Sequence, residues 1–207
     1  MMIIAVDGPT ASGKGTIAKA LAAHFGLPHL DTGLLYRAVG RQVQLNSADP
    51  DNPDDALAAC AFPDRLLSDE TLRSEAVGGF ASRVSVHPAV RRVLYDRQRV
   101  FALQDGGAVL DGRDIGTVIA PEADVKLFVT ASFAERARRR WLEMSGRRID
   151  AALAEIERDI AARDARDMCR TDAPLVAAPD AMVLDNTFLS RDNAIQAAIE
   201  AVEASRA

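Results

Sequence analysis

The chain has 207 residues, of which 48% are hydrophobic and 27% charged, and its formal net charge at pH 7 is −5. This length predicts one domain whose core needs neither a disulfide nor a structural metal, and the acidic balance argues against a broad nucleic-acid-binding surface. Two widely separated cysteines and the lack of an apolar run of about 18 residues predict a cytoplasmic protein with reduced thiols and no membrane contact.

The first third of the chain predicts a strand, a glycine-rich loop, a helix, a strand and a second helix. The expected elements are a buried strand at Ile3–Val6, a helix from Ile17 to Phe25 that ends at Gly26, a strand at Pro28–Leu30 and a helix through Leu34–Val39. Residues 46–85 are rich in Asp, Pro and Ala and then turn polar, so we expect an irregular insertion of short helices there.

The rest of the chain continues the alternation of strands and helices. We expect strands at Ala108–Leu110, Val125–Val129 and Met182–Leu184, and helices at Val90–Leu103, after the capping pair Ser132 and Glu135, at Ile149–Cys169 and at Ala194–Val202. Five strands that alternate with helices predict an α/β fold with a parallel sheet covered on both faces. Ligands of such sheets bind at the carboxyl ends of the strands.

The segment GPTASGKGT, Gly8 to Thr16, lies between the first strand and the first helix. Glycines there allow backbone N–H groups to turn toward a phosphate, and the helix start adds its partial positive charge. Lys14 would contribute a charge between the outer phosphates, and Thr16 a hydroxyl for a phosphate or for the shell of Mg²⁺. We therefore predict a phosphate-binding loop rather than an ordinary glycine turn.

Acidic and basic side chains follow two other predicted strands. Asp111, which ends the third strand, can orient the phosphate loop or water bound to Mg²⁺, although an ordinary Asp-Gly turn gives the same pattern. Thr32 can cap the helix that follows the second strand, and Arg37 can then reach an acceptor phosphate. A cap followed by a solvated arginine is the alternative interpretation of that segment.

Of the 25 basic residues, 22 are arginines, and the three lysines are Lys14, Lys19 and Lys126. Arg163, Asp167 and Arg170 are spaced i, i+4 and i+7, which predicts one stripe on a late helix. A charged stripe is usually a solvated face, but arginines on a closing lid also neutralise a transferring phosphoryl group.

Six segments together resemble the bacterial cytidylate kinases: GPTASGKGT, LDTGLLYR, SRVSVHPAVR, LDGRDIGTVIAP, KLFVTAS and RDARDMCR. The resemblance implies a P-loop NTPase-type fold that transfers the γ-phosphoryl group of MgATP to CMP or dCMP. It also implies a core at residues 1–31, 90–135 and 171–207, a monophosphate-binding insertion at about 32–89 and a lid at about 136–170. The polar stretch Leu66–Ala81 is shorter than is usual in that family.

The resemblance also implies roles for individual residues. ATP would bind Gly8, Pro9, Thr10, Ala11, Ser12, Gly13, Lys14, Gly15 and Thr16, with Lys14, Arg163 and Arg170 catalytic, and Mg²⁺ would be held through water at Thr16 and Asp111. CMP would bind Thr32, Arg37, Ser82, Arg91, Arg113, Asp114 and Asp167, of which Ser82, Arg91 and Asp114 would read the cytosine edge. We expect a monomer with no nucleic-acid partner.

Three alternatives remain open on the residues alone. The same core could phosphorylate UMP, AMP or shikimate. A GTP-dependent switch is a second alternative, although no N-K-x-D motif is present. An arginine-rich nucleic-acid-binding module is the third, and the acidic balance argues against it.

Overall fold

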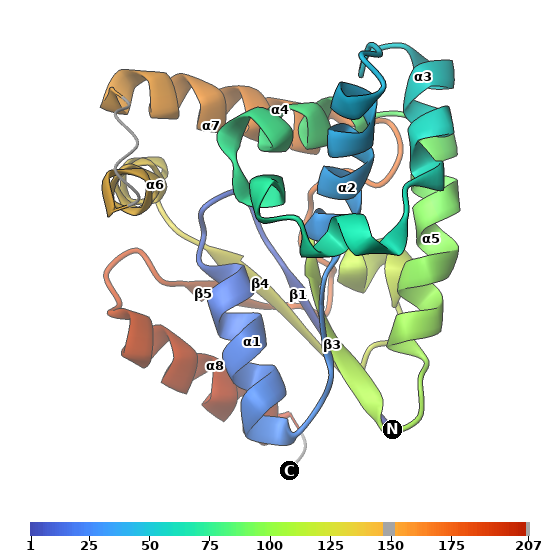
Figure 1. Ribbon diagram of the computed structural model, residues 1–207. Helices are drawn as coiled ribbons and strands as arrows, with labels where there is room; N and C mark the ends of the chain where they lie inside the picture. Colours follow the sequence, from blue (N-terminus) through green and yellow to red (C-terminus); the bar gives the residue numbers. More distant parts are fainter. Residues whose placement is uncertain (147–151, 206–207) are drawn as a thin grey trace. The chain divides into compact units, whose positions relative to one another are not determined.

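The computed structural model describes residues 1–146 and 152–205. The strands are β1 Met2–Asp7, β2 His29–Asp31, β3 Gly107–Gly112, β4 Val125–Thr130 and β5 Met182–Asp185 (Figure 1). The helices are α1 Lys14–Phe25, α2 Thr32–Leu45, α3 Pro53–Ala58, α4 Glu75–Val84, α5 Pro88–Ala102, α6 Phe133–Gly146, α7 Leu153–Cys169 and α8 Arg191–Ala204. Within these residues, no helix combines the length and the apolar character that crossing a membrane requires.

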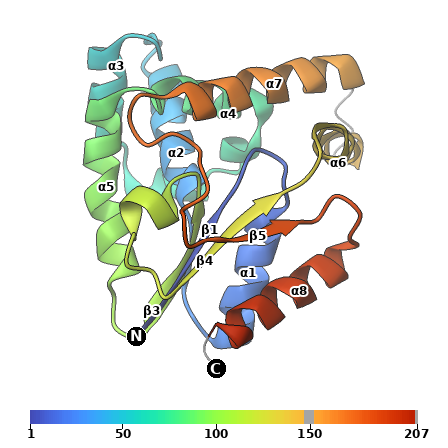
Figure 2. The same ribbon diagram turned by 180° about the vertical axis from the view of Figure 1, so that it is seen from behind.

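The five strands form one sheet in the order β2-β3-β1-β4-β5, seen from behind in Figure 2. Strand β1 lies in the centre, with parallel neighbours β3 and β4, and β5 runs parallel to β4. The predicted α/β fold with a five-stranded parallel sheet is confirmed. The centre of such a sheet, after the carboxyl end of β1, is where the glycine-rich loop begins.

The chain divides into two compact units, of which the first contains residues 1–29 and the described residues from 102 onward. In this unit, successive side chains of β1 point to opposite faces of the sheet. Ile4 and Val6 point into a core shared with α1 and α8, because helix positions such as Leu21 and Ala198 fill that face. Asp7 points to the other face, where the short helical turn Ile115–Ile119 packs.

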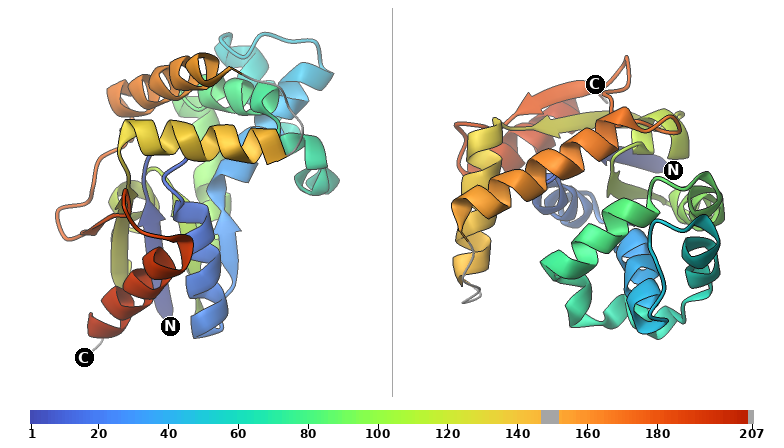
Figure 3. Two further views of the ribbon diagram at one scale, coloured as in Figure 1. Left: turned by 90° about the vertical axis from the view of Figure 1, so that its left-hand side faces the viewer. Right: turned by 90° about the horizontal axis from the view of Figure 1, so that it is seen from above.

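Helices α6 and α7 form a pair within the same unit, drawn in yellow and orange in Figure 3. Their contact is apolar, with Ala137 and Met144 from α6 against Ile156 and Ile160 from α7. The predicted helix at Ile149–Cys169 is observed from Leu153 onward, whereas residues 147–151, which the predicted lid includes, lie outside the described residues.

The second unit, Leu30–Phe101, holds α2 to α5 and three short 3₁₀ helices around a core that includes Leu35, Val39, Val84 and Leu94. Helices α2 and α4 approach closely at Gly40, where an added Cβ would lie 2.8 Å from the backbone nitrogen of Ala81. The unit includes α5, which the predicted insertion at residues 32–89 leaves out.

Candidate functional site

The glycine-rich loop leaves β1 and enters α1 through a backbone that two glycines make possible. Gly13 has φ +89°, a left-handed conformation that costs glycine little, and it occupies the N-cap position of α1. At Gly8 a Cβ would lie 2.1 Å from the Val129 carbonyl oxygen, so that position has no room for a side chain. Ala11 also has a positive φ of 59°, which is uncommon outside glycine and frequent at ligand-binding loops.

Carbonyl oxygens of the loop accept hydrogen bonds from side chains outside the loop and from Lys14 within it. Arg136 donates to the Thr10 oxygen over 3.1 Å, Asn186 donates to the Ser12 oxygen over 2.9 Å, and Lys14 Nζ lies 3.3 Å from the Pro9 oxygen. A peptide group is planar and trans, so a carbonyl held on one side turns the next N–H to the other. The loop therefore has the geometry of an anion site, with the start of α1 behind it.

Asp7 fastens the segment after β3 to the end of β1. Its two carboxylate oxygens accept from the backbone N–H groups of Ile115 (2.9 Å) and Gly116 (2.8 Å). Burial raises the pKa of Asp7 to about 6, against the two backbone hydrogen bonds, while nearby Asp114 raises it further and Lys14 lowers it. Asp114, a predicted cytosine-reading residue, is thus positioned next to a clamped turn.

Asp111 lies between a histidine and the phosphate loop. One carboxylate oxygen is 2.7 Å from Nε2 of His29, and the other is 3.5 Å from where a Cβ of Gly15 would stand. The glycine after Lys14 thus leaves room for the Asp111 carboxylate at the start of α1, which is what the predicted role of Asp111 requires.

Three arginines surround the buried carboxylate of Asp167 on α7. Arg113 Nε donates to it over 2.8 Å, and the same guanidinium donates to the Thr10 hydroxyl over 3.0 Å. Burial alone would raise the pKa of Asp167, but Arg113, then Arg170 and Arg163, hold it below its ordinary value. Asp167 is therefore an ionised centre that gathers three cations beside the phosphate loop.

A second buried ion pair joins α6 to α7. Arg136 Nη1 lies 2.6 Å from a carboxylate oxygen of Asp164, and both side chains are almost fully buried. The same nitrogen donates to the Thr10 carbonyl of the loop. Removing either partner would leave a buried charge uncompensated, so this pair fixes where the two helices meet the loop.

The second unit carries its own set of polar side chains. Arg37 on α2 donates through Nη1 to the carbonyls of Leu72 (2.6 Å) and Ser74 (3.0 Å). Thr32 and Ser82 are buried, and the guanidinium carbon of buried Arg91 lies 5.8 Å from the centre of the Tyr36 ring. These side chains come from α2, α4 and α5, which pack on one apolar core.

A family model described as cytidylate kinase matches residues 4–204, almost the whole chain. The chain belongs to the cytidylate kinase family. The resemblance inferred from the six sequence segments is thereby confirmed.

Named relatives agree with the family model. A cytidylate kinase from Cereibacter sphaeroides is 55% identical over 204 residues, which is 99% of this chain and 96% of the relative. Cytidylate kinases from Rhodopseudomonas palustris and Xanthobacter autotrophicus are 53% and 52% identical, and each match covers 100% of this chain and 98% or 99% of the relative.

Two solved structures have a similar fold. An uncharacterized protein from Eubacterium ventriosum gives a TM-score of 0.55 at 14% identity, with 98% of this chain and 99% of that chain covered. A Thermus thermophilus protein gives 0.50 at 24% identity, with 100% and 98% covered. At these identities the likeness supports the fold alone.

The site residues predicted from the sequence resemblance divide between the two units. The first unit contains the loop, Asp111, Arg113, Asp114, Arg163, Asp167 and Arg170, and the second contains Thr32, Arg37, Ser82 and Arg91. Two details of the prediction are wrong: Thr32 does not cap α2, and Arg170 does not lie on the same helix as Arg163 and Asp167. Asp31 occupies the N-cap of α2 and Thr32 is the first helical residue; α7 ends at Cys169, so Arg170 follows it in an extended conformation.

Sequence reasoning missed four residues: Arg136, Arg139 and Asn186, which donate to carbonyls of the loop, and Asp7, which holds the segment after β3. Asp7 and Asn186 carried a usable signal, because Asp7 ends β1 and Asn186 directly follows β5, at the edge of a parallel sheet where ligands bind. Arg136 and Arg139 did not, since the sequence offers four arginines on α6 and only the fold shows which two reach the loop.

Proposed function

We propose that this chain transfers the γ-phosphoryl group of ATP to CMP or dCMP by direct in-line attack of an acceptor phosphate oxygen. The observation that carries the proposal is the anion-binding loop Gly8–Thr16 after the central strand, in a chain of the cytidylate kinase family. UMP, AMP and shikimate as acceptors, a GTP switch and a nucleic-acid-binding module are less well supported, because the family match covers nearly the whole chain.

The proposed site for ATP consists of the backbone N–H groups of the loop and of positively charged side chains. The N–H groups of the loop and Lys14 would hold the outer phosphates, and Arg163 and Arg170, which act electrostatically on Asp167, would face the transferring group. Phosphoryl transfer needs little covalent chemistry, so positioning and charge neutralisation by these residues would supply most of the catalysis. No covalent intermediate on the protein is required.

The proposed acceptor residues are those that the sequence resemblance assigns to CMP. Arg37 and Arg113 would bind the phosphate of CMP, Asp167 would bind at its sugar, and Thr32 would lie near the nucleotide. Ser82, Arg91 and Asp114 together offer a hydroxyl, a guanidinium and a carboxylate, which match the O2, N3 and amino group of cytosine. A uracil or adenine edge presents a different arrangement of donors and acceptors, so this trio would favour cytosine.

Thr16 and Asp111 have the chemistry that Mg²⁺ prefers, since both offer oxygen atoms at the start of α1. The Asp111 carboxylate approaches Gly15, one residue from Thr16, which fits a position that holds Mg²⁺ through water. The ion would neutralise phosphate charge when bound. We further infer a cytoplasmic monomer that binds neither nucleic acid nor membrane.

The test is product analysis with purified protein, ATP, Mg²⁺ and CMP. The proposal predicts CDP and ADP in equal amounts and no reaction without CMP. ADP formed without CDP would instead indicate hydrolysis and would overturn the transfer reaction.

A further inference from the structure

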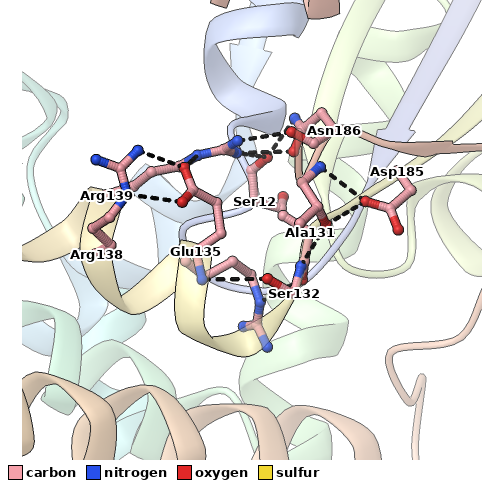
Figure 4. A network of polar contacts seen from close by, with 10 residues as sticks. Ser12, Ala131, Ser132, Glu135, Arg138, Arg139, Asp185 and Asn186 are labelled. Atoms are coloured by element: carbon pink, nitrogen blue, oxygen red, sulfur yellow. Dashed lines mark hydrogen bonds and ion pairs between the residues drawn. The ribbon is translucent and has the colours of Figure 1, made fainter. Parts of the chain in front are cut away.

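Asn186 is almost fully buried, 2% exposed, in the segment that follows β5, and its side chain contacts the phosphate loop (Figure 4). Its amide nitrogen donates to the Ser12 carbonyl oxygen over 2.9 Å. Its amide oxygen accepts from Arg139 Nη1 over 2.8 Å. Both polar atoms of the side-chain amide are therefore hydrogen-bonded.

The orientation of this amide follows from its neighbours. A guanidinium has only donors, so the side-chain oxygen of Asn186 must face Arg139. The amino group then faces the Ser12 carbonyl, which can only accept. Arg139 also donates through Nη2 to the backbone oxygen of Asn186 over 2.8 Å, which fixes the residue at two points.

The Ser12 carbonyl belongs to the peptide group whose other end is the Gly13 N–H. Because that group is planar and trans, holding the carbonyl toward Asn186 turns the Gly13 N–H to the opposite side. Gly13 is the left-handed N-cap of α1, and a Cβ there would lie 3.3 Å from the Asn186 nitrogen. Asn186 thus packs directly against the residue whose N–H the loop presents at the helix start.

Arg139 is itself held by α6. Glu135, one turn earlier, accepts from Arg139 Nε over 2.9 Å. Hydrogen bonds from Arg138 and then Arg139 lower the pKa of Glu135 to about 2, so the carboxylate stays ionised at neutral pH. The chain of contacts runs from Glu135 through Arg139 and Asn186 to Ser12.

We propose that Asn186 is a positioning residue for the ATP phosphates, and that Arg139 orients its amide and so makes the loop geometry depend on helix α6. This inference rests on the proposed function, because it assigns to the loop the phosphates of the donor nucleotide. Asn186 touches no reacting atom in this account; it acts through the Ser12–Gly13 peptide.

Asn186→Asp is the most selective variant. The carboxylate keeps the acceptor for Arg139 but replaces the donor to Ser12 with a second acceptor, which repels the carbonyl. We expect the Kd of ATP, measured by calorimetry, and the KM for ATP to rise about tenfold or more. The buried Ser12 carbonyl would lose the Asn186 amide donor at 2.9 Å and retain the longer contact from Arg139 Nη1 at 3.5 Å. The KM for CMP should change less than twofold.

Two further variants make the result interpretable. Arg139→Met changes a partly exposed position and should raise the KM for ATP severalfold. This variant tests the inference independently should Asn186→Asp fail to fold. Thr187→Val is the matched control. It removes the Thr187 hydroxyl, which accepts from the Ser132 N–H and donates to Asp185 in the same network, and neither of these bonds involves the phosphate loop. Its affinity for ATP should equal that of the wild type.

The outcomes separate the two proposals. Wild-type protein that phosphorylates CMP, together with Asn186→Asp or Arg139→Met variants that bind ATP as tightly as the wild type, would overturn the inference and leave the function intact. An equal rise in the KM for ATP and for CMP would also contradict it, because that pattern indicates general loosening. Wild-type protein that neither binds ATP nor makes CDP would remove the function and the inference together.

Discussion

The Asp7 carboxylate combines burial with two backbone hydrogen bonds, and burial has the larger effect on its pKa. A folded-state pKa of about 6, against an ordinary value of 3.8, means that the folded protein binds a proton more tightly than the unfolded chain. The stability gained from protonated Asp7 is present below about pH 4 and is lost as the pH rises to about 6.

Asp7→Asn should remove this dependence, since the amide has a similar shape and does not ionise. We expect the free energy of unfolding of the wild type, relative to Asp7→Asn, to fall by about 3 kcal/mol between pH 4 and pH 6 and then to level off. Urea unfolding at several pH values measures it. A difference that stays constant across this range would show that Asp7 does not titrate there.

Arg170 and Arg158 offer a matched pair for the proposed transfer chemistry. Arg170 acts on the Asp167 cluster, whereas Arg158 is exposed on α7. Arg170→Ala should lower kcat by about a hundredfold or more and raise the KM for ATP much less, because charge on the transferring group is greatest in the transition state. Arg158→Ala should leave both constants within twofold. Steady-state kinetics that show only a KM change for Arg170→Ala would count against the role.

At the scale of elements, the contact between α2 and α4 depends on the absence of one side chain. An added Cβ at Gly40 would meet the backbone nitrogen of Ala81 at 2.8 Å and the Cβ of Phe80 at 3.0 Å, neither of which is the end of a flexible side chain. Gly79 lies within α4 and has nothing within 4 Å of its added Cβ. Alanine substitutions at Gly40 and Gly79 therefore measure two separate effects on stability: steric overpacking at Gly40 and helix propensity at Gly79.

Gly40→Ala should destabilise the protein by about 1–3 kcal/mol through overpacking. Gly79→Ala should stabilise it by up to about 1 kcal/mol, because alanine is the better helix former. Chemical denaturation of both variants against the wild type gives the two values. A loss of stability of similar size in both would mean that the close approach at Gly40 is not what limits the packing.

Elements with a strong periodic pattern were predicted well, for a physical reason. The apolar runs at Ile3–Val6 and Val125–Val129 are strands of a sheet buried on both faces, and Gly26 ends α1 with φ +66°, as a C-terminal glycine does. Helix α4 was harder to predict because its Gly78-Gly79 pair lowers helix propensity. Packing on α2 and the cap at Ser74 form the helix regardless.

For the whole molecule, the sequence predicts family and sheet but not which residues support the loop. Short motifs next to strands predict site roles for Lys14, Asp111 and Arg113, since residues near the carboxyl ends of parallel strands lie at the edge of the sheet where ligands bind. Contacts such as Asn186 to Ser12 join residues 174 positions apart. Only the strand order, which sets β5 beside β4 and β4 beside β1, accounts for them.

The most direct test of the account is the kcat/KM of the wild-type protein for CMP, dCMP, UMP, AMP, GMP and shikimate at fixed MgATP. We expect values for CMP and dCMP that exceed each of the others by at least about a hundredfold, because an unmatched base would leave the polar groups of Ser82, Arg91 and Asp114 unpaired. A higher value for UMP, AMP or shikimate would leave the phosphate loop in place and contradict the assignment of these three residues to cytosine.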